Sequence, residues 1–189
     1  MSVTALDPQT ALIVVDLQQG IIGSRFIHPI AEVINQTRSL SEGFRDNELA
    51  VVLVKVAGRA PGRREPPARL RTLPEGWTDL IPELDPQPSD ILVTKTTWGA
   101  FASTGLDAGL KQESFTQAVI TGVATSTGVE STARQAYEEG FNVTLAIDAI
   151  SDVRPEAHAY SLKHVLPRLG ETGTTRQITA LLDARSISK

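Results

Sequence analysis

The sequence predicts a three-layer α/β/α sandwich around a parallel sheet, a Rossmann-like architecture, and three observations support this fold class. The chain has 189 residues, a length that suits one compact domain spanning 1–189. Short apolar runs rich in valine and isoleucine recur along it, nearly continuous, as in strands buried on both faces. Segments with helical spacing of apolar residues separate the runs, and this alternation gives a sandwich with right-handed crossovers.

The apolar runs are the expected strands of the sheet. They occupy residues 11–15, 49–56, 91–93, 118–120 and 143–147. The first ends in Asp16, the third is followed by Lys95, and the fifth is expected to end at Asp148.

The helices are expected from apolar residues three and four positions apart. One such series lies between the first two runs, at Ile30, Val33, Ile34, Leu40 and Phe44. A second covers 129–137 and precedes Gly140, which stands where a glycine commonly ends a helix. A third helix is expected after Pro155, and a fourth over 175–182, with Thr174 and Gln177 spaced as a capping box.

The stretch 57–89 interrupts the alternation. It is too long for a simple connection and holds most of the chain's 11 prolines, so we expect an excursion over one end of the sheet. Its arginines could bind substrate carboxylates, or they could lie in a solvated loop. They are Arg59, Arg63, Arg64, Arg69 and Arg71.

Composition excludes several kinds of function. The chain carries 22 acidic and 18 basic residues, a net charge of -4, which disfavours nucleic-acid binding. There is no cysteine, hence no disulfide, thiolate metal site or cysteine nucleophile, and only three histidines. No apolar run is long enough to span a membrane, and no signal peptide or glycine-rich phosphate loop is visible. We therefore expect a cytoplasmic protein that uses no metal or other cofactor.

In a parallel sheet, ligands bind beyond the carboxyl ends of the strands. Asp16 and Lys95 are expected at two such ends, where an acid and a base could face one pocket. Each also has a simpler interpretation, because Asp16 could be a turn residue and Lys95 a solvated side chain.

The turn after the fourth run is the third candidate element. Thr127 and Glu130 are spaced as a capping box that would open the following helix. A helix N-terminus offers free N–H groups, and Gly128 would present one without a side chain. Such a group could bind a carboxylate or a developing oxyanion.

Three segments together resemble the isochorismatase-like hydrolase family, within the cysteine hydrolase superfamily. They read ALIVVDLQ from residue 11, Lys95 followed by WGAF from residue 98, and GVATSTGVESTAR from residue 122. The resemblance implies a six-stranded parallel sheet whose sixth strand is 171–173, and a cis peptide between Val123 and Ala124. It also implies a homodimer or homotetramer, with 57–89 and the segment 98–101 as contact surfaces.

One residue departs from the family pattern. Gly128 stands at the position of the family's nucleophilic cysteine, so a thioester mechanism is excluded. The resemblance then implies that Asp16 acts as general acid or base and that Lys95 stabilises charge, with Gly128 completing the catalytic site. It also implies a small, anionic substrate. The alternative is an inactive small-molecule-binding or scaffolding relative that lost the cysteine.

The remaining candidate site residues could also have simpler roles. Ala124 and Thr125 are expected to contact substrate through the turn, and Trp98 and Phe101 to wall the pocket. Both aromatic residues could instead join a subunit interface, and core packing accounts equally well for Phe101. The histidines His158 and His164 are interpreted as surface or partly buried helix residues. No Asp-x-His pair follows the second strand, so no metal site is assigned.

Overall fold

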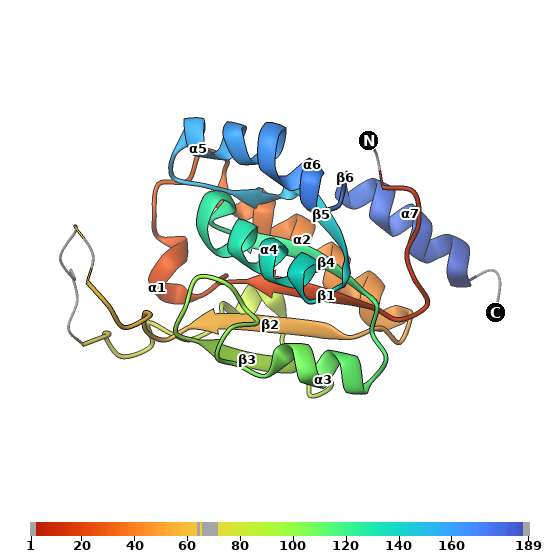
Figure 1. The fold of residues 1–189 in the computed structure, drawn as a ribbon, viewed down its shortest axis with the longest axis horizontal. Helices are drawn as coiled ribbons and strands as arrows, with labels where there is room; N and C mark the ends of the chain where they lie inside the picture. Colours follow the sequence, from red (N-terminus) through yellow and green to blue (C-terminus); the bar gives the residue numbers. More distant parts are fainter. Residues whose placement is uncertain (1–2, 64, 66–71, 187–189) are drawn as a thin grey trace.

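A computed structural model of the protein describes residues 3–63, 65 and 72–186, and it confirms the expected fold class. Six parallel strands form one sheet in the order β3-β2-β1-β4-β5-β6. Their bounds are β1 Thr10–Val15, β2 Val51–Val56, β3 Ile91–Lys95, β4 Gln117–Val123, β5 Asn142–Ser151 and β6 Glu171–Gly173. The order starts at β1 and grows outward in both directions, so the carboxyl ends of β1 and β4 meet at the centre of one edge (Figure 1).

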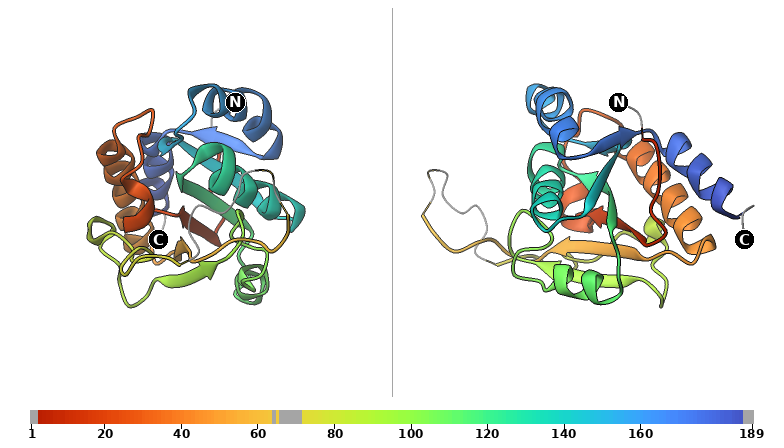
Figure 2. Two further views of the ribbon diagram at one scale, coloured as in Figure 1. Left: turned by 90° about the vertical axis from the view of Figure 1, so that its left-hand side faces the viewer. Right: turned by 45° about the vertical axis from the view of Figure 1, so that its right-hand side comes forward.

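Helices cover both faces of the sheet (Figure 2). One face packs against α2 and α7 and the other against α3, α4 and α6. The central strand β1 alternates between the two cores: Ile13 and Val15 join one, while Leu12 and Val14 join the other. This double burial explains why the strand reads as a continuous apolar run.

The helices begin and end close to the expected positions. Their bounds are α1 Gln19–Ile22, α2 Ile30–Asp46, α3 Leu106–Gln112, α4 Glu130–Glu138, α5 Pro155–Tyr160, α6 Leu166–Leu169 and α7 Thr175–Ser186. Shorter turns are the 3₁₀ turn η1 Pro82–Leu84 and two π-helical turns, η2 Thr125–Val129 and η3 Ser161–Val165. The capping box of α7 is confirmed, because the Thr174 N–H donates to Gln177 Oε1 (2.9 Å) and the Gln177 N–H to Thr174 Oγ1 (3.3 Å).

The fifth strand is longer than its apolar run, and the expectation that it ends at Asp148 is wrong. The ladder with β4 shifts register between Ile120 and Gly122, after which β5 continues to Ser151. The Asp148 carboxylate instead accepts hydrogen bonds from the N–H (2.7 Å) and hydroxyl (2.9 Å) of Thr175, at the start of α7. The acid at the carboxyl end of β5 is therefore Asp152.

Within the excursion 57–89, the described residues 57–63 and 72–76 form an arm that extends from the carboxyl edge of the sheet (Figures 1 and 2). Gln18 anchors its base: the side-chain amide donates to the carbonyls of Val56 and Trp77, both at 3.1 Å, and its oxygen accepts the Val56 N–H at 2.7 Å. Arg59 and Arg63 lie on the described part of the arm, whereas Arg64, Arg69 and Arg71 lie outside the described residues. No helix in the described part of the chain is long and apolar enough to cross a membrane.

Candidate active site

Asp16 and Lys95 meet at the carboxyl edge of the sheet. Asp16 directly follows β1 and Lys95 is the last residue of β3. Strand β2 lies between them, and the lysine side chain spans it to bring Nζ within 2.8 Å of Asp16 Oδ2. The predicted convergence of these two side chains is confirmed.

The backbone around Asp16 turns the carboxylate into the site. Asp16 has a φ of +56°, in the left-handed region that aspartate tolerates better than most residues. Gly122 on β4, with a φ of +106°, permits the close approach, because a Cβ there would lie 2.1 Å from the Val15 carbonyl oxygen. The end of β1 and the end of β4 therefore pack backbone to backbone beneath the carboxylate.

Lys95 is almost completely buried, with 1% of its surface exposed. Its ammonium group donates to Asp16 Oδ2 and, at 2.5 Å, to the Trp98 carbonyl oxygen. A buried cation requires such partners, because leaving the charge unpaired away from water costs several kcal/mol by the usual order of magnitude. The lysine is therefore a fixed positive charge rather than the solvated side chain of the simpler interpretation.

Asp16 holds its proton more tightly than an ordinary aspartate. Burial raises its pKa from 3.8 to about 6, against the attraction and hydrogen bond of Lys95, which lower it. Its second oxygen, Oδ1, has no hydrogen-bond partner among the described residues. The carboxyl group thus has one oxygen held by Lys95 and one buried oxygen that can carry the proton.

The turn after β4 forms the third part of the site. The peptide between Val123 and Ala124 is cis, as the resemblance implied. The Ala124 carbonyl then accepts the N–H groups of Thr127 and Val129, both at 3.1 Å, and the chain enters η2 and α4. The helical turn begins at Thr125, earlier than the sequence indicated.

The capping box expected at Thr127 and Glu130 is wrong. The early start of the helical turn places Thr127 inside η2 and Glu130 at the junction of η2 and α4, and no side-chain capping bond forms at either element. The Glu130 carboxylate binds Arg134 on the same helix (2.9 Å) and the Ser161 hydroxyl (2.6 Å). Thr127 points its hydroxyl back to the Ala124 carbonyl at 3.4 Å.

Gly128 lies directly against Asp16. A Cβ at this position would be 2.9 Å from the Val123 carbonyl oxygen and 3.0 Å from both Asp16 Oδ2 and Val15 Cγ1. The carboxylate therefore occupies space into which a side chain at position 128 would project. Glycine permits this packing because it has no Cβ.

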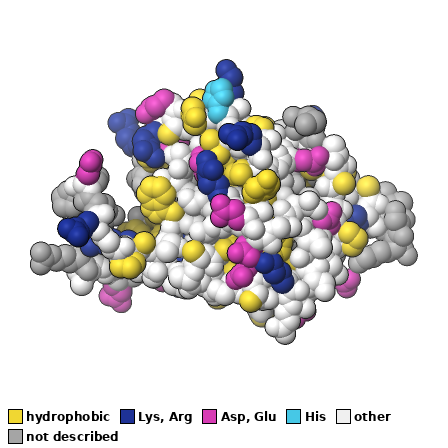
Figure 3. All heavy atoms as spheres, viewed as in Figure 1, with side chains coloured by type: hydrophobic (Ala, Val, Ile, Leu, Met, Phe, Trp, Pro, Cys, Tyr) yellow, Lys and Arg dark blue, Asp and Glu magenta, His cyan; other side chains and the backbone are white. Residues whose placement is uncertain are grey.

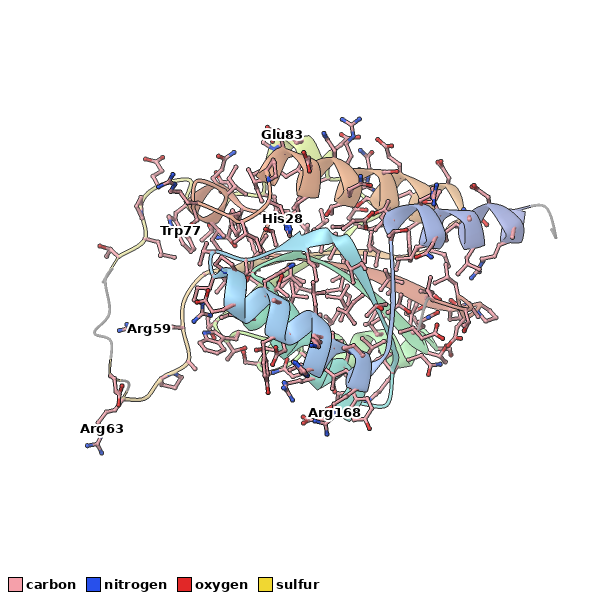
Figure 4. All side chains as sticks on the ribbon, turned by 90° about the horizontal axis from the view of Figure 1, so that it is seen from above. His28, Arg59, Arg63, Trp77, Glu83 and Arg168 are labelled. Atoms are coloured by element: carbon pink, nitrogen blue, oxygen red, sulfur yellow. The ribbon has the colours of Figure 1, made fainter. Side chains whose placement is uncertain are left out.

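A cavity of about 530 Å³ opens beside these groups. Asp16, Lys95, Trp98 and Gly128 line it, with Arg59 and Arg63 on the side of the arm. Trp98 is 67% exposed at the rim. Figure 4 shows Arg59 and Arg63 along the arm, beyond the body of the domain.

Three residues expected to contact substrate have other surroundings. Phe101 is buried in the core and its ring packs at a tilt against Phe141 with centroids 5.6 Å apart, which is the core-packing alternative. Thr125 is fully buried, and its hydroxyl pairs with His158 Nδ1 at 2.9 Å. Neither they nor Ala124 are among the described residues that line the cavity.

His158 is more buried than the surface or partly buried helix residue that was expected, because only 7% of it is exposed. Burial and the nearby His28 lower the pKa of His158, although Asp152 acts in the opposite direction. The rings of His28 and His158 meet edge to face with centroids 5.0 Å apart. His164 is exposed on η3, as expected.

Sequence reasoning missed Asp152 and its contacts to the turn. The Asp152 carboxylate accepts the N–H (2.7 Å) and the hydroxyl (2.8 Å) of Ser126. Arg154 also donates to the Ser126 hydroxyl at 2.9 Å. The signal that could have found Asp152 is the apolar pair Ala149 and Ile150, which follows Asp148 and carries the fifth strand on to Ser151.

The site has the groups for acid–base chemistry. Asp16 has a raised pKa of about 6 and a buried oxygen without a partner among the described residues, Lys95 supplies fixed positive charge, and Gly128 adds no side chain beside the carboxylate.

Comparisons with known proteins agree with this fold. The isochorismatase domain model matches residues 10–177. The chain is 38% identical over 176 residues to the uncharacterized isochorismatase family protein YecD of Escherichia coli O157:H7, covering 89% of this chain and 94% of that one. It is 34% identical to the Bacillus subtilis isochorismatase family protein YwoC, covering 89% and 92%. An isochorismatase family structure from Burkholderia thailandensis superimposes with a TM-score of 0.91 at 35% identity, covering 96% of this chain and all of that one. The chain therefore belongs to the isochorismatase family of hydrolases.

Proposed function

We propose that this protein hydrolyses a small anionic metabolite by acid–base catalysis at Asp16, without a covalent thioester. The observation that carries the proposal is the buried Asp16–Lys95 pair, in which one carboxyl oxygen is fixed and the other has no partner among the described residues. A pair fixed in this way costs free energy when buried, so its presence at a cavity favours function over stability.

The protonation state of Asp16 suits a general acid. With a pKa of about 6, a measurable fraction of the carboxyl group stays protonated near neutral pH. Asp16 gives this proton to the leaving group of the substrate as its bond breaks. Water adds at the electrophilic atom, and the proton that it loses returns to Asp16, so the overall reaction consumes one water and leaves the protein unchanged.

Lys95 and the arm support an anionic substrate. Lys95 stabilises negative charge that develops beside Asp16, and its two acceptors hold its position during the reaction. Arg59 and Arg63 line the cavity from the arm, where they can bind a carboxylate away from the reacting atoms. Replacing both arginines by alanine is expected to raise KM and leave kcat near the wild-type value, because their binding is the same in substrate and transition state.

The test is a screen of small anionic vinyl ethers, esters and amides with the wild-type protein and Asp16→Asn. We expect one class to be hydrolysed, with at least about 100-fold loss in Asp16→Asn. Asp90→Asn is the matched control: Asp90 is also a buried carboxylate, but it pairs with Arg45 at the amino edge of the sheet. Retained activity in Asp16→Asn would contradict the assigned role.

The alternative is a non-catalytic binding or scaffolding protein that kept the pocket. It predicts that a small anion binds with measurable affinity and is recovered unchanged. Isothermal titration of each compound, followed by analysis of the recovered ligand, separates binding from turnover.

A further inference from the structure

We propose that Asp152 is a positioning residue for this reaction, because it holds the turn that carries Gly128, beside Asp16. The inference rests on the proposed function in one respect only, namely that Asp16 is the acid. Asp152 follows β5, the neighbour of β4, so it stands at the same edge of the sheet as the turn that begins at Ala124.

Both oxygens of the Asp152 carboxylate accept hydrogen bonds, one from Ser126 and the other from Arg154. Its side chain is 1% exposed. Oδ2 accepts the Ser126 N–H and hydroxyl at 2.7 and 2.8 Å, while Oδ1 accepts the Arg154 N–H at 3.1 Å and lies 3.9 Å from the Arg154 guanidinium. Charge-assisted bonds of this kind are about twice as strong as neutral ones, so they fix the place of Ser126.

Ser126 lies midway between Ala124 and Gly128. A shift of Ser126 therefore moves Gly128, at which a Cβ would lie 3.0 Å from Asp16 Oδ2. Burial is the cause of the raised pKa of Asp16, and a displaced turn changes that burial. Asp152 thus acts on the reacting carboxyl group through the turn, without touching it.

A second anchor comes from the same part of the chain. His158 on α5 pairs with the hydroxyl of Thr125, the residue before Ser126. Thr125 and Ser126, two consecutive residues of the turn, are therefore held by the buried side chains of His158 and Asp152. Two buried polar anchors on one turn indicate that its exact placement matters, since each costs free energy to bury.

Asp152→Asn is the informative variant because it keeps the size of the side chain. The carboxylate accepts from backbone N–H groups with both oxygens, whereas an amide has one acceptor oxygen and one donor group. In either orientation, one backbone N–H faces another donor. Asp90→Asn is the control, since Asp90 is equally buried and accepts both Arg45 and the Gln87 N–H, far from the turn.

The experiment measures two properties that need no substrate. Hydrogen exchange followed by mass spectrometry reports the protection of peptides covering 122–130. Titration of the Asp16 carboxyl carbon by NMR reports its pKa. We expect Asp152→Asn to speed exchange in 122–130 and to lower the pKa of Asp16 by about one unit, because water then reaches the carboxylate. Asp90→Asn should change neither.

Ser126→Ala separates the role of the turn from the charge of Asp152. It removes the hydroxyl bond, keeps the charge and retains the backbone N–H bond to Asp152. We expect a smaller change in the same direction. The proposal fails if Asp152→Asn lowers the pKa of Asp16 while hydrogen exchange in 122–130 stays unchanged and Ser126→Ala has no effect. Such a result would mean that only the lost charge of Asp152 changes the pKa.

With a substrate from the screen, Asp152→Asn should lower kcat about 10- to 100-fold, with KM changed little, because a displaced turn affects the reacting geometry more than binding. Asp152 would have a structural role only if Asp152→Asn and Asp90→Asn lose the same stability while Asp152→Asn keeps the wild-type kcat and the wild-type titration of Asp16. If the wild type hydrolyses nothing, exchange and titration still decide the role of Asp152, while the proposed function fails separately.

Discussion

At the scale of single residues, the contact between Gly128 and Asp16 links packing to chemistry. The glycine has no positive φ that would require it, so the reason for its presence is space. A Cβ there meets a backbone carbonyl oxygen, which cannot move away as the end of a flexible side chain can. The sequence identified position 128 by resemblance, but the distance to Asp16 depends on strands far apart in the chain.

Gly128→Ala is therefore expected to lower the free energy of unfolding by about 1–3 kcal/mol, the usual cost of overpacking. Gly109→Ala is the matched control. Gly109 lies inside α3 with open space around its Cβ position, so alanine should raise the free energy of unfolding by about 0.5–1 kcal/mol. Urea denaturation measures both, and equal effects of the two variants would contradict the packing argument.

The pKa of Asp16 also predicts a pH dependence of stability. Its folded pKa of about 6 lies above the ordinary 3.8, so the folded state binds the proton more tightly. The contribution is fully present below pH 3.8 and is lost as the pH rises through 6, a change of about 3 kcal/mol. Asp16→Asn should remove this slope between pH 4 and 6. An identical slope in wild type and variant would show that other groups cause it.

At the scale of elements, the sequence predicted the strands because parallel strands buried on both faces leave a clear apolar signal. It failed at the end of β5, where a register shift lets polar Asp148 stay within the strand. It also failed at η2, since a π-helical turn after a cis peptide has no apolar periodicity of its own. Asp152 was therefore missed, because it follows the end of β5 and its partner Ser126 lies in η2.

The arm gives a prediction at this scale. Gln18 is fully buried and joins the end of β2 to Trp77, which packs over Gly20 so closely that a Cβ on Gly20 would meet its ring. Gln18→Leu leaves buried carbonyls without their donor, so stability should fall by about 1–3 kcal/mol. In a Trp98→Phe background, the emission of Trp77 should shift to longer wavelength. Unchanged emission would mean that Gln18 does not hold the base of the arm.

At the scale of the whole molecule, the topology explains why the site lies where it does. The sheet order brings the ends of β1 and β4 together at its centre, and Lys95 reaches them across β2. Acidic and basic side chains are interspersed on the face shown in Figure 3. The sequence could predict the edge of the sheet that carries the site, because every candidate residue follows a strand, but the cavity itself depends on the arm.

Assembly remains a prediction at this scale. Trp98 is exposed at the cavity rim and can contact a second copy, whereas Phe101 is buried and unable to do so without repacking. We expect light scattering at micromolar concentration to show a homodimer or homotetramer. Trp98→Ala should shift that equilibrium toward the monomer more than Tyr160→Ala, an exposed aromatic residue on α5. A wild-type monomer at that concentration contradicts the prediction.

The central claim is that burial outweighs Lys95 and keeps Asp16 available as an acid near neutral pH. NMR titration of the Asp16 carboxyl carbon in the wild-type protein tests it most directly, with Asp16→Asn used to assign the signal. The structure predicts a midpoint of about 6. A midpoint at or below 3.8 would show that the ion pair with Lys95 dominates, that Asp16 is fully ionised at neutral pH, and that it is not the general acid.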